Sequence, residues 1–88
     1  MKKPEPYSPN QPEKKKLTGE IENIIYRSDE TGYTVFSIIV SGENGKVTVI
    51  GHVAAIWVGE IVETEGKWMH HKQHGLQFKA DSITCIVP

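Results

Sequence analysis

The chain has 88 residues, of which 38% are hydrophobic and 24% charged, and its formal net charge is −1. This length allows one small domain at most, which excludes nucleotide-driven motors and doubly wound catalytic folds. The near-neutral charge does not by itself indicate a nucleic-acid partner. Cys85 is the only cysteine, and no long apolar run occurs. We therefore expect a soluble, cytoplasmic domain with no disulfide and no membrane partner.

Residues 1–16 differ in composition from the rest of the chain. They contain four of the five prolines, five lysines, two glutamates and no aliphatic side chain after Met1. Such a segment cannot bury enough apolar surface to offset its chain entropy, so it is predicted to be a flexible, disordered arm with a charge of +3. Residues 17–88 hold five basic and nine acidic side chains, a charge of −4, and form the predicted folded domain.

Five strands are predicted in the folded part, because short apolar runs alternate with turn residues. The first covers residues 17–27, and its apolar pattern shifts by one position near Glu22 and Asn23, which indicates a β-bulge. The second, residues 33–40, is apolar on both faces, as is typical of a central strand. The third, residues 46–52, follows an Asn-Gly turn, and these two strands form the clearest predicted hairpin.

The remaining elements complete a small barrel. Residues 53–58 are too few for a stable helix, so we expect a turn or loop that plugs one end of the barrel with Ile56 or Trp57. The fourth strand, residues 61–70, alternates between apolar and charged side chains, so one face is predicted to contact solvent. The fifth strand is predicted at residues 76–87 after a second hairpin turn.

Three further positions indicate local irregularity. A register change is expected near Ser82, and Gly51 and Gly66 are expected where strands bend or backbones approach closely. A bent first strand, a three-strand meander, a plug and a final hairpin describe a closed or nearly closed all-β barrel of the OB-fold type. An SH3-like barrel is the alternative, although its short helical turn usually lies between the last two strands.

Four short motifs occur in a fixed order: GYTV at 32–35, GE at 59–60, GKW at 66–68 and HGLQF at 74–78. Together they resemble the N-terminal OB domain of RecD-like ATP-dependent DNA helicases, relatives of the exodeoxyribonuclease V alpha subunit, and the likeness spans residues 17–80. The lysine-rich arm departs from that pattern. The resemblance implies a non-catalytic accessory domain that works in DNA repair and recombination and belongs to a longer parent continuing past Pro88.

ATP and Mg²⁺ are expected only in the motor domains of such a parent. The chain has no G-x-x-x-x-G-K-[ST] loop, which would bind the phosphates of ATP. We therefore expect no cofactor in this chain. The other domains of the parent helicase are expected partners.

OB barrels bind nucleic-acid strands across their second and third strands, between the loops joining strands one to two and four to five. The first of these loops carries Asp29 and Glu30, which repel phosphate, and it is flanked by Arg27 and Tyr33. The last hairpin combines cations with one aromatic residue and is the main predicted site for single-stranded DNA: Lys67, Trp68, His70, His71, Lys72, His74 and Lys79. Because the domain itself is acidic, binding is expected to be weak or context-dependent.

Several of these residues also have an ordinary structural interpretation. Alternation places Trp68 on the same inner face as Val62, which favours a core position over a stacking platform. Three other aromatic side chains are also predicted to lie in the core: Tyr26, Phe36 and Phe78. The lysines are as readily explained as solvated surface charges.

Metal binding and catalysis have little support. Imidazoles are common metal ligands, but His70 and His74 are predicted to lie across a turn, and no motif adds a carboxylate or thiol. Cys85 lies in the terminal strand, where a small apolar role is the default. No nucleophile with a neighbouring base is recognisable, so no catalytic residue is predicted.

Three functions remain open at this point. The first is an accessory helicase domain that contacts single-stranded DNA or positions it beside the motor. The second is a protein or interdomain interaction module without direct DNA binding, with Ile61 or Met69 as contacts. The third is an OB domain of another DNA-processing enzyme, such as the large subunit of exonuclease VII.

Overall fold

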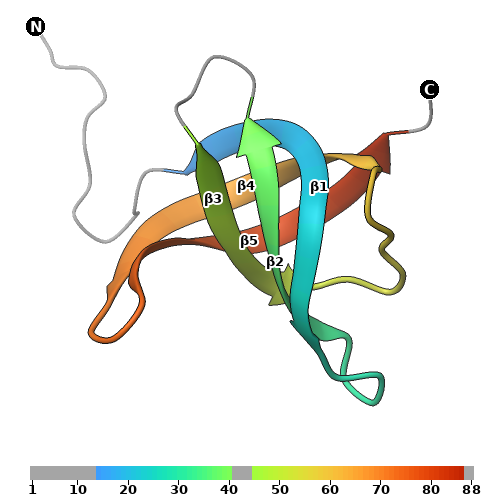
Figure 1. The fold of residues 1–88 in the computed structure, drawn as a ribbon, viewed down its shortest axis with the longest axis horizontal. Helices are drawn as coiled ribbons and strands as arrows, with labels where there is room; N and C mark the ends of the chain where they lie inside the picture. Colours follow the sequence, from blue (N-terminus) through green and yellow to red (C-terminus); the bar gives the residue numbers. More distant parts are fainter. Residues whose placement is uncertain (1–13, 41–44, 87–88) are drawn as a thin grey trace, which may run out of the picture.

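The computed structural model describes residues 14–40 and 45–86, which form a five-stranded barrel (Figure 1). The strands are β1 (Lys15–Arg27), β2 (Tyr33–Val40), β3 (Lys46–His52), β4 (Ile61–His71) and β5 (Gly75–Ile86). They close in the order β1-β2-β3-β5-β4, and only β3 and β5 pair in parallel. The predicted all-β barrel is confirmed. Its plug connection lies between β3 and β4, which argues against the SH3-like alternative.

The strand bounds differ little from those predicted. β1 begins at Lys15, so Lys15 and Lys16 belong to the barrel wall, where they lie opposite Gly66 and Glu65 of β4. Three of the predicted features lie wholly or partly outside the described residues. They are the arm at residues 1–13, most of the turn at residues 41–44 and the end of the last strand at residues 87–88.

β1 bends because it serves two neighbours. Its first part pairs with β4 and its later part with β2, and Figure 1 shows it curving across the barrel. The register with β2 shifts between Ile21 and Asn23, which confirms the predicted bulge at Glu22. A second shift, between Ile24 and Tyr26, was not predicted. Each extra residue increases the local bend of the strand, and this allows one strand to close the barrel.

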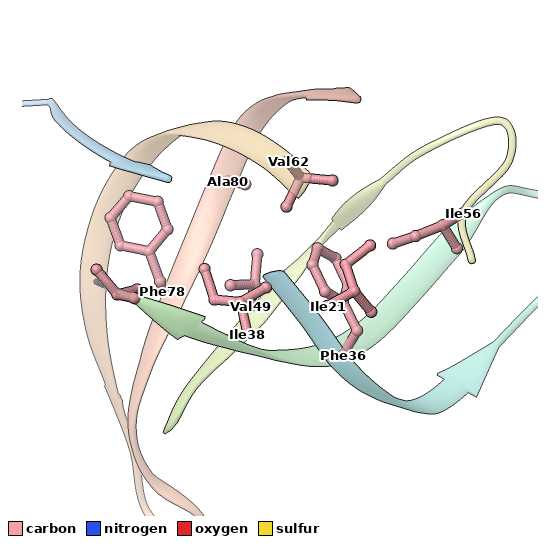
Figure 2. Close-up of a cluster of buried hydrophobic side chains, with 9 residues drawn as sticks. Ile21, Phe36, Ile38, Val49, Ile56, Val62, Phe78 and Ala80 are labelled. Atoms are coloured by element: carbon pink, nitrogen blue, oxygen red, sulfur yellow. The ribbon is translucent and has the colours of Figure 1, made fainter. Parts of the chain in front are cut away.

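The core is a single cluster of apolar side chains inside the barrel (Figure 2): Ile21, Phe36, Ile38, Val40, Val49, Ile56, Val62, Phe78 and Ala80. Phe36 and Phe78 are fully buried, as predicted. The predicted core position of Tyr26 is wrong, because its side chain is 55% exposed. The second register shift in β1 places Tyr26 opposite Val35, on the outer face of the sheet.

The predicted core position of Trp68 is also wrong, since 39% of its surface is exposed. The residue does lie on the inner face, because its ring contacts Phe78 edge-to-face with centroids 5.2 Å apart. However, β1 pairs with β4 only as far as Gly66, and the β4–β5 hairpin continues beyond the barrel wall (Figure 1). Trp68 therefore lies on the inner face at a position that β1 does not cover.

β4 and β5 approach each other closely at Gly66. The register shifts between Glu65, which lies opposite Ser82, and Gly66, which lies opposite Ala80, so the predicted irregularity near Ser82 is confirmed. A Cβ atom on Gly66 would collide with the carbonyl oxygen of Lys79. Glycine is needed here because only a residue without a side chain permits this backbone contact.

Residues 53–60 connect β3 to β4 and plug the barrel with Ile56. Ile56 is 7% exposed, whereas Trp57 is 61% exposed, so only the first of the two predicted plug residues enters the core. Figure 2 shows Ile56 at one end of the buried cluster. Two backbone hydrogen bonds hold the connection against β1: Gly59 N–H donates to Ile21 O at 2.9 Å, and Ile21 N–H donates to Glu60 O at 2.8 Å.

Ile56→Ala is expected to lower the free energy of unfolding by about 2–4 kcal/mol, because it removes a buried side chain and leaves a cavity. Trp57→Ala is expected to change it by less than about 0.5 kcal/mol, because that side chain is mainly in solvent. Urea unfolding followed by circular dichroism measures both. Equal losses in the two variants would contradict the assignment of Ile56 as the plug.

Candidate nucleic-acid interface

The outer face of the barrel carries a groove of about 480 Å³ over β1, β2 and β3, bordered by the β4–β5 hairpin. Its lining residues are Ile25, Tyr26, Tyr33, Val35, Thr48, Ile50, His71, His74 and Gln77. The groove follows from strand alternation, because burying Phe36 and Val49 turns Val35 and Ile50 outward.

The floor of the groove is apolar. Val35 of β2 lies between Tyr26 of β1 and Ile50 of β3, and the parallel pairing places Ile50 opposite Lys79 of β5. In a small antiparallel barrel, an outward-facing position is expected to be polar. An apolar strip on the two central strands is therefore a surface suited to an apolar ligand face.

The aromatic side chains stand beside this floor. The Tyr33 ring lies 6.1 Å from Tyr26 and 5.6 Å from His52 between centroids, with interplanar angles of 59° and 67°. Rings inclined in this way are not stacked face to face, and Tyr26 is more than half exposed. Tyr33 is the middle member of the row and lines the groove together with Tyr26. This arrangement leaves ring surface on which a flat ligand could stack.

Two imidazoles form the opposite border, at the tip of the β4–β5 hairpin. The His71 and His74 rings are 4.6 Å apart. His71 Nδ1 accepts hydrogen bonds from the backbone N–H groups of Gln73 at 3.1 Å and His74 at 3.2 Å. An accepting Nδ1 places the proton of the neutral ring on Nε2. The turn thus fixes the tautomer and position of His71.

The predicted hairpin cluster is divided between two faces. His71 and His74 line the groove. Lys67 and Lys79 lie opposite each other on the same outward face, but they are not among the residues that line the groove. Trp68 lies on the inner face, opposite Phe78, and is not among the groove residues. His70 shares that face by alternation, and Lys72 is exposed in the turn. Of the residues flanking the first loop, Tyr33 lines the groove.

Arg27 is engaged within the domain. Its guanidinium donates hydrogen bonds to Thr34 Oγ1 at 2.8 Å, to Val53 O at 3.0 Å and to Ala54 O at 2.6 Å. Its Nε lies 3.4 Å from a carboxylate oxygen of Asp29. These contacts join the β1–β2 turn to the start of the plug connection. Most of the donors of Arg27 are therefore occupied, and its DNA contact stays a prediction.

Sequence reasoning did not select six of the groove residues: Ile25, Tyr26, Val35, Thr48, Ile50 and Gln77. One signal was present, because residues 33–40 are apolar on both faces. This pattern predicts a central strand, and it also fits a strand with a ligand-binding outer face. The positions of Tyr26 and Gln77 depend on the bulge and on the hairpin, which alternation does not locate.

Other kinds of site find no geometry in the described part of the chain. No group of three or more His, Cys, Asp or Glu residues is placed to hold a metal ion in residues 14–40 and 45–86. No described helix is long and apolar enough to cross a membrane. Burial raises the pKa of the Cys85 thiol above its usual value. Glu60 raises it further, because its carboxylate accepts a hydrogen bond from the thiol at 3.4 Å and carries a negative charge. Less thiolate forms at neutral pH as a result.

A closed five-stranded barrel in this order, with a groove over its second and third strands and the β4–β5 loop at its border, is an OB-fold. The family model of the OB-fold domain of ATP-dependent DNA helicase YrrC matches residues 14–88. The chain belongs to this family. The predicted membership among the OB-fold domains of ATP-dependent DNA helicases is thereby confirmed.

Proposed function

We propose that the domain binds single-stranded DNA in the groove and positions it beside the motor of a helicase. The observation that carries this proposal is the row of Tyr26 and Tyr33 beside an apolar floor on β2 and β3. Every nucleobase has an aromatic face, so stacking on such rings tolerates any sequence. Membership of a DNA helicase family supports DNA as the nucleic acid.

The charges around the groove suggest weak binding. None of its lining residues is Lys, Arg, Asp or Glu. Two lysines border the groove by register: Lys79 lies opposite Ile50, and Lys67 lies opposite Lys79. Phosphates would therefore lie along the rim while bases enter the groove. Because few phosphates are neutralised, the affinity depends less on salt than that of a basic OB-fold.

The wider context is part of the same proposal. ATP and Mg²⁺ belong to the motor domains of the parent helicase, and the other domains of that helicase are partners of this one. Three statements about this domain stay predictions: that it works in DNA repair and recombination, that it is related to exodeoxyribonuclease V, and that it is located in the cytoplasm.

A second candidate function, docking onto a protein surface, is favoured by a separate apolar row on the barrel. Three exposed isoleucines form this row: Ile39 on β2, Ile61 on β4 and Ile86 on β5. Ile39 and Ile61 both lie opposite Glu20 of β1, and Ile86 lies opposite Ile61. Met69, also predicted as a contact, is exposed on the hairpin. None of these residues lines the groove, so a protein contact there is compatible with DNA binding.

His71→Glu is expected to weaken binding of a fluorescein-labelled single-stranded oligonucleotide several-fold, because it places a negative charge at the groove. His70→Glu is the matched control, since it adds the same charge one residue away on the other face of the hairpin and should change affinity little. Fluorescence anisotropy at low and moderate salt measures both. A Lys2→Ser, Lys3→Ser variant controls for nonspecific attraction by the basic N-terminal residues.

Two results would count against DNA binding in the groove. Equal effects of the two glutamate variants would show that the groove is not the binding surface. Absence of binding by the wild type at low salt would leave protein docking as the favoured function.

A further inference from the structure

A second hollow lies on the outer face of the barrel, where β1 pairs with both β2 and β4. Its volume is about 350 Å³, and it shares no lining residue with the groove. Its lining residues are Thr18, Gly19, Glu20, Ile39 and Ile61. Glu20 lies opposite Ile39 on one side and opposite Ile61 on the other, and both isoleucines are exposed. The hollow thus combines two apolar side chains with one carboxylate between them.

Glu20 carries the one charge in the lining of this hollow, and the charges around it are paired. Glu63, opposite Thr18, lies 3.9 Å from the Nζ atom of Lys16. Glu22, two residues after Glu20, lies 3.4 Å from the Nζ atom of Lys46. By contrast, the Glu20 carboxylate forms no ion pair or hydrogen bond with any residue in 14–40 or 45–86. The hollow therefore offers an unpaired negative charge to a ligand.

An arginine side chain has the chemistry that matches both features. Its hydrocarbon stem can lie on apolar surface while its charged head contacts a carboxylate. The planar guanidinium can pair with both carboxylate oxygens, and it loses water more readily than the ammonium group of lysine.

Three other occupants bring a negative charge against Glu20. A nucleic-acid strand and an anionic lipid both carry phosphate. A second copy of the domain, docked by two-fold symmetry through this hollow, would place Glu20 against itself, because such a contact uses the same patch on both copies. A protein that presents a cation is the occupant that the charge favours.

We propose that this hollow binds an arginine side chain of a protein partner, with the guanidinium on Glu20 and the stem against Ile39 and Ile61. The inference rests on the second candidate function, docking onto a protein, and does not depend on DNA binding in the groove. Ile86, exposed and opposite Ile61, extends the apolar surface toward β5, where residues next to the arginine would contact it. Arginine is among the residues that contribute most to protein interfaces.

The test uses Nα-acetyl-arginine methylamide as the probe, with the citrulline analogue, which has nearly the same shape and no charge, as its control. Both are titrated into the isotope-labelled domain and followed by NMR. The arginine probe is expected to shift the methyl signals of Ile39 and Ile61 and the amide signal of Glu20. Its affinity should exceed that of the citrulline probe about two- to fivefold, the range for one solvent-exposed ion pair.

Three variants separate the contributions. Glu20→Gln should abolish the difference between the two probes, because it removes the charge and keeps the shape. Glu30→Gln is the matched control, since Glu30 is an exposed carboxylate in the β1–β2 turn, outside the hollow, and it should leave the difference unchanged. Ile61→Ala should weaken the binding of both probes, because both have the apolar stem.

The outcomes distinguish the arginine site from the functions on which it bears. Shifts beside Glu30 as large as those beside Glu20, or a preference that persists in Glu20→Gln, would overturn the arginine site. Shifts at Ile39 and Ile61 that are equal for the two probes would overturn the arginine site and leave an apolar docking surface. No shift with either probe would overturn docking at this hollow as well. DNA binding is measured separately at the groove, so it can stand or fail independently.

Discussion

Tyr33→Ala is expected to weaken binding of single-stranded DNA about tenfold or more. Tyr33 lines the groove between the rings of Tyr26 and His52, so its loss removes the centre of the aromatic row. Stacking of one base on an aromatic side chain contributes about 1–3 kcal/mol, and 1.4 kcal/mol corresponds to a tenfold change in affinity. Anisotropy titration of the wild type and the variant measures the ratio directly.

Two controls accompany this substitution. Tyr33→Phe keeps the ring, so its affinity should stay within about twofold of the wild type if stacking is the main contribution. Trp57→Ala removes an aromatic side chain that is more exposed than Tyr33 but lies outside the groove, and it should leave the affinity unchanged. An equal loss in Trp57→Ala would indicate that DNA contacts exposed aromatic residues without regard to the groove.

Gly66→Ala is expected to destabilise the domain by about 3 kcal/mol, the upper range for forcing extra atoms into a packed site. The new methyl group would meet the carbonyl oxygen of Lys79 and would lie 2.7 Å from Ala80 Cα. Both neighbours are backbone atoms in β5, so they move only if the pairing of β4 with β5 is distorted. Small domains have total stabilities of about 5–15 kcal/mol, so this loss is a large fraction. Urea unfolding followed by circular dichroism gives the difference.

The control for this effect is the preceding residue. Glu65→Ala changes an exposed side chain on the same strand and should alter stability by less than about 0.5 kcal/mol. If Gly66→Ala costs no more than Glu65→Ala, the strands do not approach as closely as the structure shows.

The strands could be predicted from the sequence because alternation and turn residues report local geometry directly. The bulge at Glu22 was visible as a shift of the apolar pattern, and the irregularity near Ser82 was visible in the same way. Tyr26 was misplaced because a second bulge in the same strand reverses its face, and two shifts so close together leave no clear periodic trace. Trp68 was misplaced because a repeating pattern does not show where the barrel wall ends.

The site was harder to predict for a related reason. The hairpin cations were grouped because they are close in sequence, yet adjacent residues on a strand point to opposite faces, so Trp68 and His71 lie on different sides. The groove itself combines residues from β1, β2, β3 and the hairpin, which only the closed barrel brings together. Gln77 could not be recognised from the sequence, because its place in the groove depends on the position of the β4–β5 hairpin beside β3.

The parallel join between β3 and β5 consists of only two residue pairs, Val49 with Phe78 and Ile50 with Lys79. The barrel is thus a long antiparallel ribbon closed along one short seam. Ile50 belongs both to this seam and to the groove floor, and Gln77 lies on the other side of the seam. A ligand that contacts both residues holds the two edges together, so its binding and the closure of the barrel are thermodynamically linked. Occupancy of the groove and resistance of the domain to unfolding would then rise together.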